Sequence, residues 1–294
     1  MRILYYGNFT ESWSTESYIA RALERAGHEV TRWQVNGKEA DLRPDYDVFL
    51  FAKLFQWDVQ KSLTFLKMMR GISHKVVCWC FDLLNPGFRH ERYQWASAVS
   101  EACDLFCTTD GSIADHLSNS KVLRQGIGDD LRIGEAAPEL LCEVLFLGDA
   151  YSKRADMVSV FADYFQRRFW HTNKQRGERL NDMMASCKLV VAPPWPCFDR
   201  YWSNRLYVVT GYGGAILHPN IEGLTEEGWI HGENCFLYDP RIGNKELAQL
   251  ADEILTRMFN AFDPFIGVKR NGIKHCHDNF TYGHRVKSLL EWLS

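Results

Sequence analysis

The sequence lacks the patterns that mark several large classes of protein. No apolar run approaches the roughly 20 residues that a membrane-spanning helix needs, and the nine cysteines form no CxxC pair. Lys and Arg number 34 against 37 for Asp and Glu, so the formal net charge of -3 lacks the basic excess of a non-specific nucleic-acid binder. Neither a GxGxxG fingerprint nor a Walker loop is present, which argues against NAD binding and against a P-loop nucleotidase.

The composition is that of a chain that folds throughout. Hydrophobic residues make up 46% and charged residues 24% of the 294 residues, far from the signature of disorder. At roughly 100–200 residues per domain, this length predicts two domains. The cysteines are odd in number, and several lie inside apolar runs such as 76–81, which favours reduced, buried thiols over disulfides. We therefore expect a soluble, cytoplasmic protein.

Apolar runs alternate with helical patterns along the chain. The first predicted strand is 2–6, and a second series begins at 143–149 with the same order of strand, glycine and helix. This alternation predicts an α/β fold of two Rossmann-like domains, each a parallel sheet covered by helices. We place the N-terminal domain at 1–138, the C-terminal domain at 139–280, and a last helix at 281–294 that returns to the N-terminal domain.

Glycines that follow predicted strands are the first candidates for a binding site. Gly7 ends the first strand and Gly148 the first strand of the second series. Glycine turns and helix N-termini at the carboxyl edge of a parallel sheet present free N–H groups to an anion, so we expect a phosphorylated ligand. A tight turn without a ligand is the alternative at each glycine.

The stretch 203–217 is the most informative part of the sequence. Ser203 or Asn204 is a candidate cap for a helix that begins at Arg205, whose guanidinium would fork onto phosphate oxygens. Gly213 and Gly214 end the predicted helix and would bring backbone close to the same site. An exposed helix with a surface arginine and a C-terminal glycine pair is the alternative.

In this ordered set of motifs the sequence resembles the GT-B glycosyltransferases, in particular the spore-maturation-type group, similar to glycosyltransferase families 1 and 4. The resemblance covers most of the second half of the chain and extends more loosely to the first. The matching segments in the second half are 146–154, 205–214, 222–224, 232–239, 246–247 and 280–286. Those in the first half are 5–7, 26–30 and 79–82.

The resemblance implies a GT-B architecture of two facing domains and transfer of a sugar, most simply a hexose, from a UDP- or GDP-sugar to an unidentified hydroxyl acceptor. The donor would be held mainly by the C-terminal domain, without a cofactor or a required metal. Arg205 would bind the diphosphate, where fixed positive charge stabilises the leaving group. The residues assigned to the donor are Gly7, Gly148, Arg154, Trp195, Arg205, Tyr207, Gly213, Gly214 and Glu222. Trp195 and Tyr207 would stack on a base or sugar ring, with burial in the core as the alternative.

One feature departs from that family. Many retaining GT-B enzymes carry two glutamates about eight positions apart that contact the sugar and the ribose, and Arg200 and Val208 occupy those places here. The donor contacts must therefore differ, with Asp199 or Glu222 as substitutes for one carboxylate. The same departure keeps open a non-catalytic protein that binds sugar nucleotides.

The acceptor hydroxyl needs a base, and three residues are candidates. Asp82 follows an apolar strand and matches an acidic residue of the family, Asp110 ends the next strand, and His116 lies in the segment after it. We favour Asp82, while a helix-capping role is the alternative for an aspartate after a strand.

A basic stretch at 167–179 is the last local feature. Five basic residues lie there beside two aromatic ones: Arg167, Arg168, Lys174, Arg176 and Arg179. Such a stretch would track a phosphate backbone while a ring stacks on a base, which suggests an acceptor in DNA carrying hydroxymethylated bases, as in phage enzymes. A solvated turn before the helix at 180–185 is the alternative that we favour.

Overall fold

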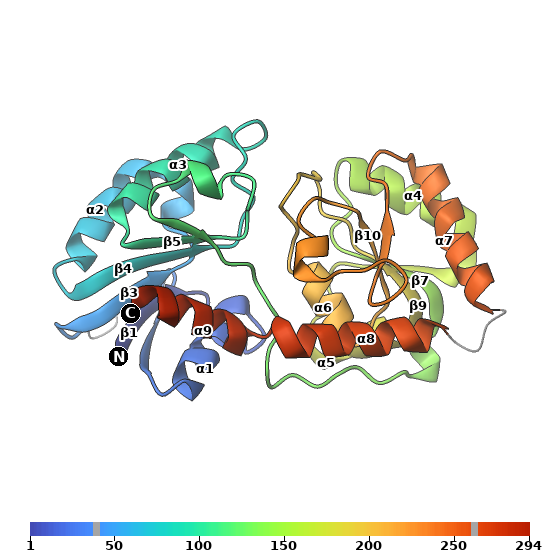
Figure 1. The fold of residues 1–294 in the computed structure, drawn as a ribbon, viewed down its shortest axis with the longest axis horizontal. Coiled ribbons are helices and arrows are strands. Elements are labelled where there is room, and N and C mark those ends of the chain that lie inside the picture. Colours follow the sequence, from blue (N-terminus) through green and yellow to red (C-terminus); the bar gives the residue numbers. More distant parts are fainter. Residues whose placement is uncertain (38–41, 260–263) are drawn as a thin grey trace. The chain divides into compact units, whose positions relative to one another are not determined.

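The computed structural model describes residues 1–37, 42–259 and 264–294, which form two compact units (Figure 1). Unit 1 comprises Met1–Asp129 and Thr281–Ser294, and unit 2 comprises Asp130–Phe280. Each unit contains one parallel sheet with helices packed against it, so the predicted α/β class with Rossmann-like domains is confirmed. Within the described ranges, every helix is too short or too polar to cross a membrane.

Unit 1 is built on a six-stranded sheet of order β2-β1-β3-β4-β5-β6, with every pair parallel. The strands are β1 Arg2–Gly7, β2 Glu29–Gln34, β3 Tyr46–Phe51, β4 Ser73–Cys80, β5 Leu105–Thr108 and β6 Ser120–Val122. The helices are α1 Thr15–Arg25, α2 Val59–Met69, α3 His90–Ala102 and α9 Tyr282–Leu293, with short 3-10 turns η1 Phe55–Trp57 and η2 Ala114–His116.

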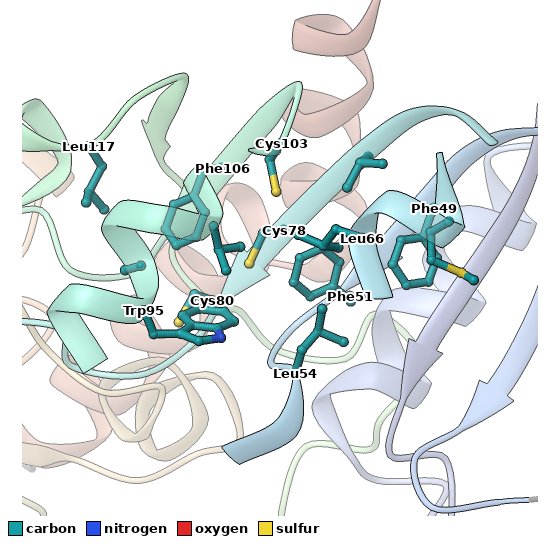
Figure 2. Close-up of a cluster of buried hydrophobic side chains, with 14 of the residues drawn as sticks. Phe49, Phe51, Leu54, Leu66, Cys78, Cys80, Trp95, Cys103, Phe106 and Leu117 are labelled. Atoms are coloured by element: carbon teal, nitrogen blue, oxygen red, sulfur yellow. The ribbon is translucent and has the colours of Figure 1, made fainter. Parts of the chain in front are cut away.

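The apolar runs of unit 1 form its core because the central strands are covered on both faces. Phe49, Phe51, Cys78 and Cys80 point from β3 and β4 toward α2 and α3, where Trp95 closes the cluster (Figure 2). All five side chains are fully buried. The buried cysteines are free thiols, as their place in apolar runs predicted.

The last helix, α9, belongs to unit 1 and lies beside α1 (Figure 1). The ring of Tyr282 stacks on that of Tyr18 at 5.7 Å between centroids. The Gly283 N–H donates to the carboxylate of Asp129, which also pairs with Arg25 at 2.7 Å. Helix α9 therefore closes the apolar side of α1.

Unit 2 is built on a five-stranded parallel sheet of order β11-β10-β9-β7-β8. The strands are β7 Cys142–Leu147, β8 Phe169–Thr172, β9 Cys187–Val191, β10 Ile216–Pro219 and β11 Phe236–Tyr238. The helices are α4 Lys153–Phe165, α5 Gly177–Ser186, α6 Arg205–Gly211, α7 Asn244–Phe259 and α8 Pro264–Asn279, with short turns η3 Pro138–Leu140, η4 Gln166–Arg168 and η5 Thr225–Glu227.

The two units divide earlier in the chain than residue 138, where the sequence placed the boundary. Segment 130–138 packs on unit 2 through polar contacts that hydropathy does not reveal. The Gly134 N–H donates to Tyr212 O at 2.9 Å, and Arg132 pairs with Asp182 at 2.8 Å. A further difference is β8, which forms inside the basic stretch that we interpreted as a turn, because its apolar residues pair with β7.

Candidate anion-binding site

In the unit 2 sheet, successive strands are added first on one side of β7 and then on the other, while all strands stay parallel. The chain leaves β7 for β8 on one side and returns to β9 on the other, so the carboxyl ends of β7 and β9 flank a topological switch point. Ligands of doubly wound sheets bind at such a point. Gly148 directly follows β7, and Pro193 lies two residues after the end of β9.

Gly148 forms the turn at this switch point. Its φ of +137° is one that side-chain-bearing residues rarely adopt. A Cβ atom there would lie 2.8 Å from Nη1 of Arg205 and 3.9 Å from Nη1 of Arg154. The glycine therefore lets two guanidinium groups approach the backbone of the turn, which is the arrangement that a phosphate requires.

Arg154 lies in the first turn of α4 and is only 4% exposed. Its Nη2 donates to the carbonyl of Pro193 at 2.8 Å, so the side chain spans the switch point from β7 to β9. Its guanidinium also lies 5.3 Å from the ring centroid of Tyr151, and its Nε is buried without a hydrogen-bond partner. A buried cation held in this way attracts an anion.

Arg205 is the first residue of α6 and directs its guanidinium at the same turn. Burial and the charge of Arg154 lower the pKa of Arg205 to about 10, although Tyr201, Tyr151 and Asp149 oppose the shift. Its Nε is also buried without a partner. Within the described part of the chain, neither arginine forms an ion pair with a carboxylate, so a bound anion would relieve the repulsion between them.

His218, on β10, is a residue of this region that the sequence did not suggest. Burial, with the charge of Arg205, lowers the pKa of His218 to about 4. Its Nδ1 donates to the carbonyl of Pro219 at 2.8 Å, so Nε2 is the unprotonated nitrogen of a neutral ring. A single histidine in an apolar strand carries no sequence signal, because its position beside Arg205 depends on the order of the strands.

The corresponding turn of unit 1 has the opposite charge. The switch point of the unit 1 sheet lies between β1 and β3, because β2 is added on one side of β1 and β3 on the other. Gly7 ends β1 at this point. A Cβ atom on Gly7 would lie 2.8 Å from Cγ of Glu16, whose carboxylate accepts from its own N–H and that of Asn8. Burial raises the pKa of Glu16, while the charge of Lys53 opposes the shift. The Gly7 turn thus already holds a carboxylate, which repels a second anion.

Two predicted donor contacts lie away from this site. Helix α6 has seven residues, about 10 Å in length, so Gly213 and Gly214 lie at its end opposite to Arg205. A Cβ atom on Gly214 would meet Cγ1 of Val209 at 2.8 Å, which explains the glycine by packing. We expected these glycines beside the diphosphate, and that expectation is wrong because a helix separates them from Arg205.

Tyr207 is a core residue and not a stacking platform for a ligand. It is 1% exposed, and its ring lies 5.2 Å from that of Phe280 and 6.0 Å from that of Trp229. Its hydroxyl accepts from Trp202 Nε1 at 2.9 Å and donates to Glu227 at 2.7 Å. The alternative considered from the sequence, burial in the core, therefore holds.

The remaining predicted donor residues lie in loops at the carboxyl edge of the unit 2 sheet. Trp195, in the loop between β9 and α6, is partly exposed, and the ammonium of Lys153 lies 5.0 Å from its ring centroid. Glu222 is exposed after β10, and its carbonyl accepts from the Arg200 N–H at 2.9 Å. Trp195 is therefore accessible to a ligand, whereas, among the residues that the structure describes, the only hydrogen bond of Glu222 is the one that its backbone makes with Arg200.

The three candidate bases, all in unit 1, differ in their availability. Asp110 is fully buried and accepts hydrogen bonds from Leu84 N–H, Ser112 N–H and Ser112 Oγ, so it holds the loop after β5 and is not a free base. Asp82 follows β4 and pairs with Arg92 at 3.0 Å, with its side chain 39% exposed. His116 is exposed in η2. Asp82 is the candidate at a strand end that remains accessible.

The basic stretch does not form one continuous patch. Strand β8 has four residues, so about 13 Å of strand separates Arg167 and Arg168 from Lys174, Arg176 and Arg179. Arg168 pairs with Glu143 at 2.6 Å. Arg176 donates to the carbonyls of Asn173 and Gln175. Arg168 and Arg176, which we had considered available to DNA phosphates, therefore already contact neighbouring groups of the protein.

Comparison with solved structures finds the same fold in sugar-transferring enzymes. HepE from Anabaena, in complex with UDP-glucose, superposes with a TM-score of 0.70 at 13% identity, covering 100% of this chain and 99% of that chain. Sucrose-phosphate synthase from Thermosynechococcus elongatus superposes with a TM-score of 0.69 at 12% identity, covering 99% of this chain and 97% of that chain. An α-glucosyltransferase in complex with UDP-glucose and DNA containing an abasic site superposes with a TM-score of 0.70 at 8% identity, covering 100% of this chain and 99% of that chain.

The chain has the GT-B glycosyltransferase fold. The predicted architecture is confirmed by these likenesses, which extend over the whole chain. No protein-family model and no curated protein sequence matches the chain. The resemblance to the spore-maturation-type group therefore stays a prediction. In GT-B terms, the arginine pair at the switch point lies in the C-terminal domain.

Proposed function

We propose that the protein is a nucleotide-sugar-dependent glycosyltransferase whose unit 2 binds the donor through its diphosphate. The observation that carries the proposal is the pair of guanidinium groups, Arg154 and Arg205, at the Gly148 turn. Two cations near each other, without a carboxylate partner among the described residues, are stable beside an anion of two or more charges. The Glu16 carboxylate at the corresponding turn of unit 1 disfavours the diphosphate there.

The chemistry that follows is displacement at the anomeric carbon. An acceptor hydroxyl forms a bond to that carbon, the bond from the carbon to the phosphate oxygen breaks, and the nucleoside diphosphate leaves with the electron pair. Arg154 and Arg205 would stabilise the charge that develops on the leaving oxygen, since both are held in place before the reaction. The proton of the acceptor hydroxyl would pass to a base, for which we propose Asp82.

The nature of the donor is supported by the solved structures with this fold. HepE has been solved with UDP-glucose and with UDP, and the α-glucosyltransferase with UDP-glucose. A UDP-sugar is therefore the first donor to test, and a GDP-sugar the second. The second candidate acceptor, a hydroxymethylated base in DNA, is supported by the DNA in the α-glucosyltransferase structure.

The test is binding of UDP-glucose and GDP-mannose to the wild-type protein, to Arg205→Met and to Arg257→Met, measured by calorimetry. Arg257, on α7, is 82% exposed and provides the matched control. We expect Arg205→Met to weaken binding at least about tenfold, because a charge-assisted contact is worth roughly 1.5–3 kcal/mol. Release of nucleoside diphosphate, with duplex DNA containing 5-hydroxymethylcytosine as one acceptor, then tests turnover. Equal binding by all three proteins, or no binding by any, contradicts the proposal.

A further inference from the structure

Two cysteine side chains meet at the amino edge of the unit 2 sheet. Cys142 is the first residue of β7 and Cys187 the first residue of β9, and the parallel register of the two strands pairs them directly. Their Sγ atoms lie 2.7 Å apart. Non-bonded carbon atoms, which are smaller than sulfur, lie about 3.5–4.0 Å apart, so the fold holds these two sulfur atoms closer than packing alone requires.

The backbone at this pair has the geometry that a disulfide requires. Neighbouring strands of a sheet lie about 4.7–4.9 Å apart, and disulfides join residues whose Cα atoms are about 4.4–6.8 Å apart. Because residues paired directly across two strands project to the same face of the sheet, both side chains also point the same way. Formation of an S–S bond of about 2.05 Å therefore needs a movement of the side chains and not of the strands.

Polar contacts hold the backbone on both sides of the pair. Lys269, on α8, donates from Nζ to the carbonyl of Cys187 at 2.7 Å. The Ala137 N–H donates to Ser186 Oγ at 2.9 Å, which ties the segment before Cys142 to the end of α5. The two strand starts are therefore fixed relative to each other by contacts other than the one between the sulfur atoms.

The two thiols differ in their access to solvent. Cys142 is 8% exposed and follows Leu141, which is 60% exposed, whereas Cys187 is fully buried. A small oxidant that enters from solvent therefore reaches Cys142 first. The hydrogen bond with Cys142 and burial raise the pKa of the Cys187 thiol, while the charge of Lys269 opposes the shift. Cys187 thus stays protonated at neutral pH and reacts only once its neighbour has become electrophilic.

We propose that Cys142 and Cys187 form a dithiol that a hydroperoxide converts reversibly into a disulfide. The Cys142 thiolate attacks one peroxide oxygen, the O–O bond breaks, and the leaving hydroxide takes up the Cys142 proton, which yields a sulfenic acid and water. The Cys187 sulfur then displaces the hydroxyl group from the sulfenic sulfur, and this group leaves with the Cys187 proton as a second water molecule. Each sulfur loses one electron to the peroxide oxygens, and a thiol reductant reverses the reaction.

The modification is independent of the proposed sugar transfer. Strand β7 has six residues, so about 20 Å of strand separates Cys142 from the Gly148 turn. The disulfide would join positions 45 residues apart in the sequence and would restrict the unfolded chain more than the folded one. We therefore expect oxidation to stabilise unit 2 and to leave the Gly148 turn unchanged.

The experiment treats the reduced full-length protein with hydrogen peroxide, alkylates the remaining thiols in denaturant and maps the cysteines by mass spectrometry. We expect the peptides of Cys142 and Cys187 to be joined and to separate again in dithiothreitol. The midpoint of thermal unfolding should rise by about 5–10 °C on oxidation. Cys235→Ala is the matched control, because Cys235 is also buried in unit 2, with its Sγ against the Ile230 carbonyl, and this variant should form the same cross-link. Cys187→Ala should form none and should leave Cys142 as a sulfenic or more highly oxidised acid.

The peroxide concentration is raised until Cys197, which is partly exposed, reacts. If Cys142 and Cys187 are then still thiols in the wild type, the proposal is overturned. A mixture of cross-links like the one that the same treatment gives in urea also overturns it, because the native register would not select the pair. A cross-linked protein with an unchanged unfolding midpoint overturns the claim that the disulfide fits the native sheet. No sugar nucleotide is needed, so each of these failures leaves the proposed function intact.

Discussion

At the scale of single residues, the two halves of the chain use the same glycine turn with opposite charge. Gly7 makes room for the Glu16 side chain, whereas Gly148 makes room for the Arg205 guanidinium. An anion at the carboxyl edge of a sheet benefits from the N–H groups of the turn in either unit. The neighbouring side chain decides which turn accepts it, and this favours unit 2.

Substitution of Gly148 tests this role directly. Gly148→Ala should lower the free energy of unfolding by about 1–3 kcal/mol, because alanine is strained at φ +137°. It should also abolish UDP-glucose binding, because the new methyl group displaces Arg205, which lies 2.8 Å away. Gly232→Ala is the matched control: Gly232 has φ +79° and no atom within 4 Å of its Cβ position. If both variants bind UDP-glucose equally, Gly148 is only a turn residue.

At the scale of secondary structure, the direction of each helix decides which of its residues belong to the site. Helix α6 begins with Arg205 at the carboxyl edge of the sheet and ends before Gly213 and Gly214, at the opposite edge.

The start of helix α9 is fixed by hydrogen bonds of its N-cap residue. Thr281 Oγ1 accepts from the His284 N–H, and the Thr281 N–H donates to His284 Nδ1. This capping box defines the first turn of α9.

Loss of the cap should therefore destabilise unit 1. We expect Thr281→Ala to lower the free energy of unfolding by about 1 kcal/mol, the usual cost of removing an N-cap side chain. Ser288→Ala, inside the same helix, should leave stability unchanged or slightly higher, because alanine favours helix interiors. Urea unfolding monitored by circular dichroism measures both. A Thr281→Ala protein as stable as the wild type would show that packing on α1 alone fixes α9.

At the scale of the whole molecule, unit 2 is one continuous segment, while unit 1 needs both ends of the chain. Unit 2 has its own sheet and a buried core that includes Phe146, Phe161, Val191 and Leu217. The proposed donor site, with Gly148, Arg154 and Arg205, also lies entirely within it. Donor binding should therefore be a property of unit 2 by itself.

A fragment of residues 130–280 should fold and bind UDP within about threefold of the affinity of the full chain, because all proposed donor contacts lie inside it. The counterpart, residues 1–129 joined through a flexible linker to residues 281–294 so that unit 1 is whole, should not bind UDP. Calorimetry on both fragments, after circular dichroism has established that they are folded, measures this. A folded 130–280 fragment without affinity for UDP would show that unit 1 contributes to donor binding.

The sequence by itself determined the fold class and the two Rossmann-like domains, and it named Gly148 and Arg205 as candidate site residues. Apolar runs buried on both faces of parallel sheets are continuous, so periodicity and glycine turns suffice to find strands such as β1, β4 and β7. Gly148 and Arg205 follow from a glycine after a strand and an arginine at a helix start. Short strands such as β8 were missed, because pairing with β7 outweighs the polar residues around it.

Only the tertiary structure decided which of the candidate residues meet. Strand order brings Arg154, Arg205 and His218 together at one edge of the sheet, although the sequence separates them by more than sixty positions in total. In the folded chain, Gly213 and Gly214 lie at the opposite edge of the sheet and Tyr207 is buried in the core. Asp110 is buried and accepts a hydrogen bond from the Leu84 N–H, which fixes the loop after β5. Local sequence sets the conformation of each segment, but burial and charge at a site depend on neighbours that only the folded chain supplies.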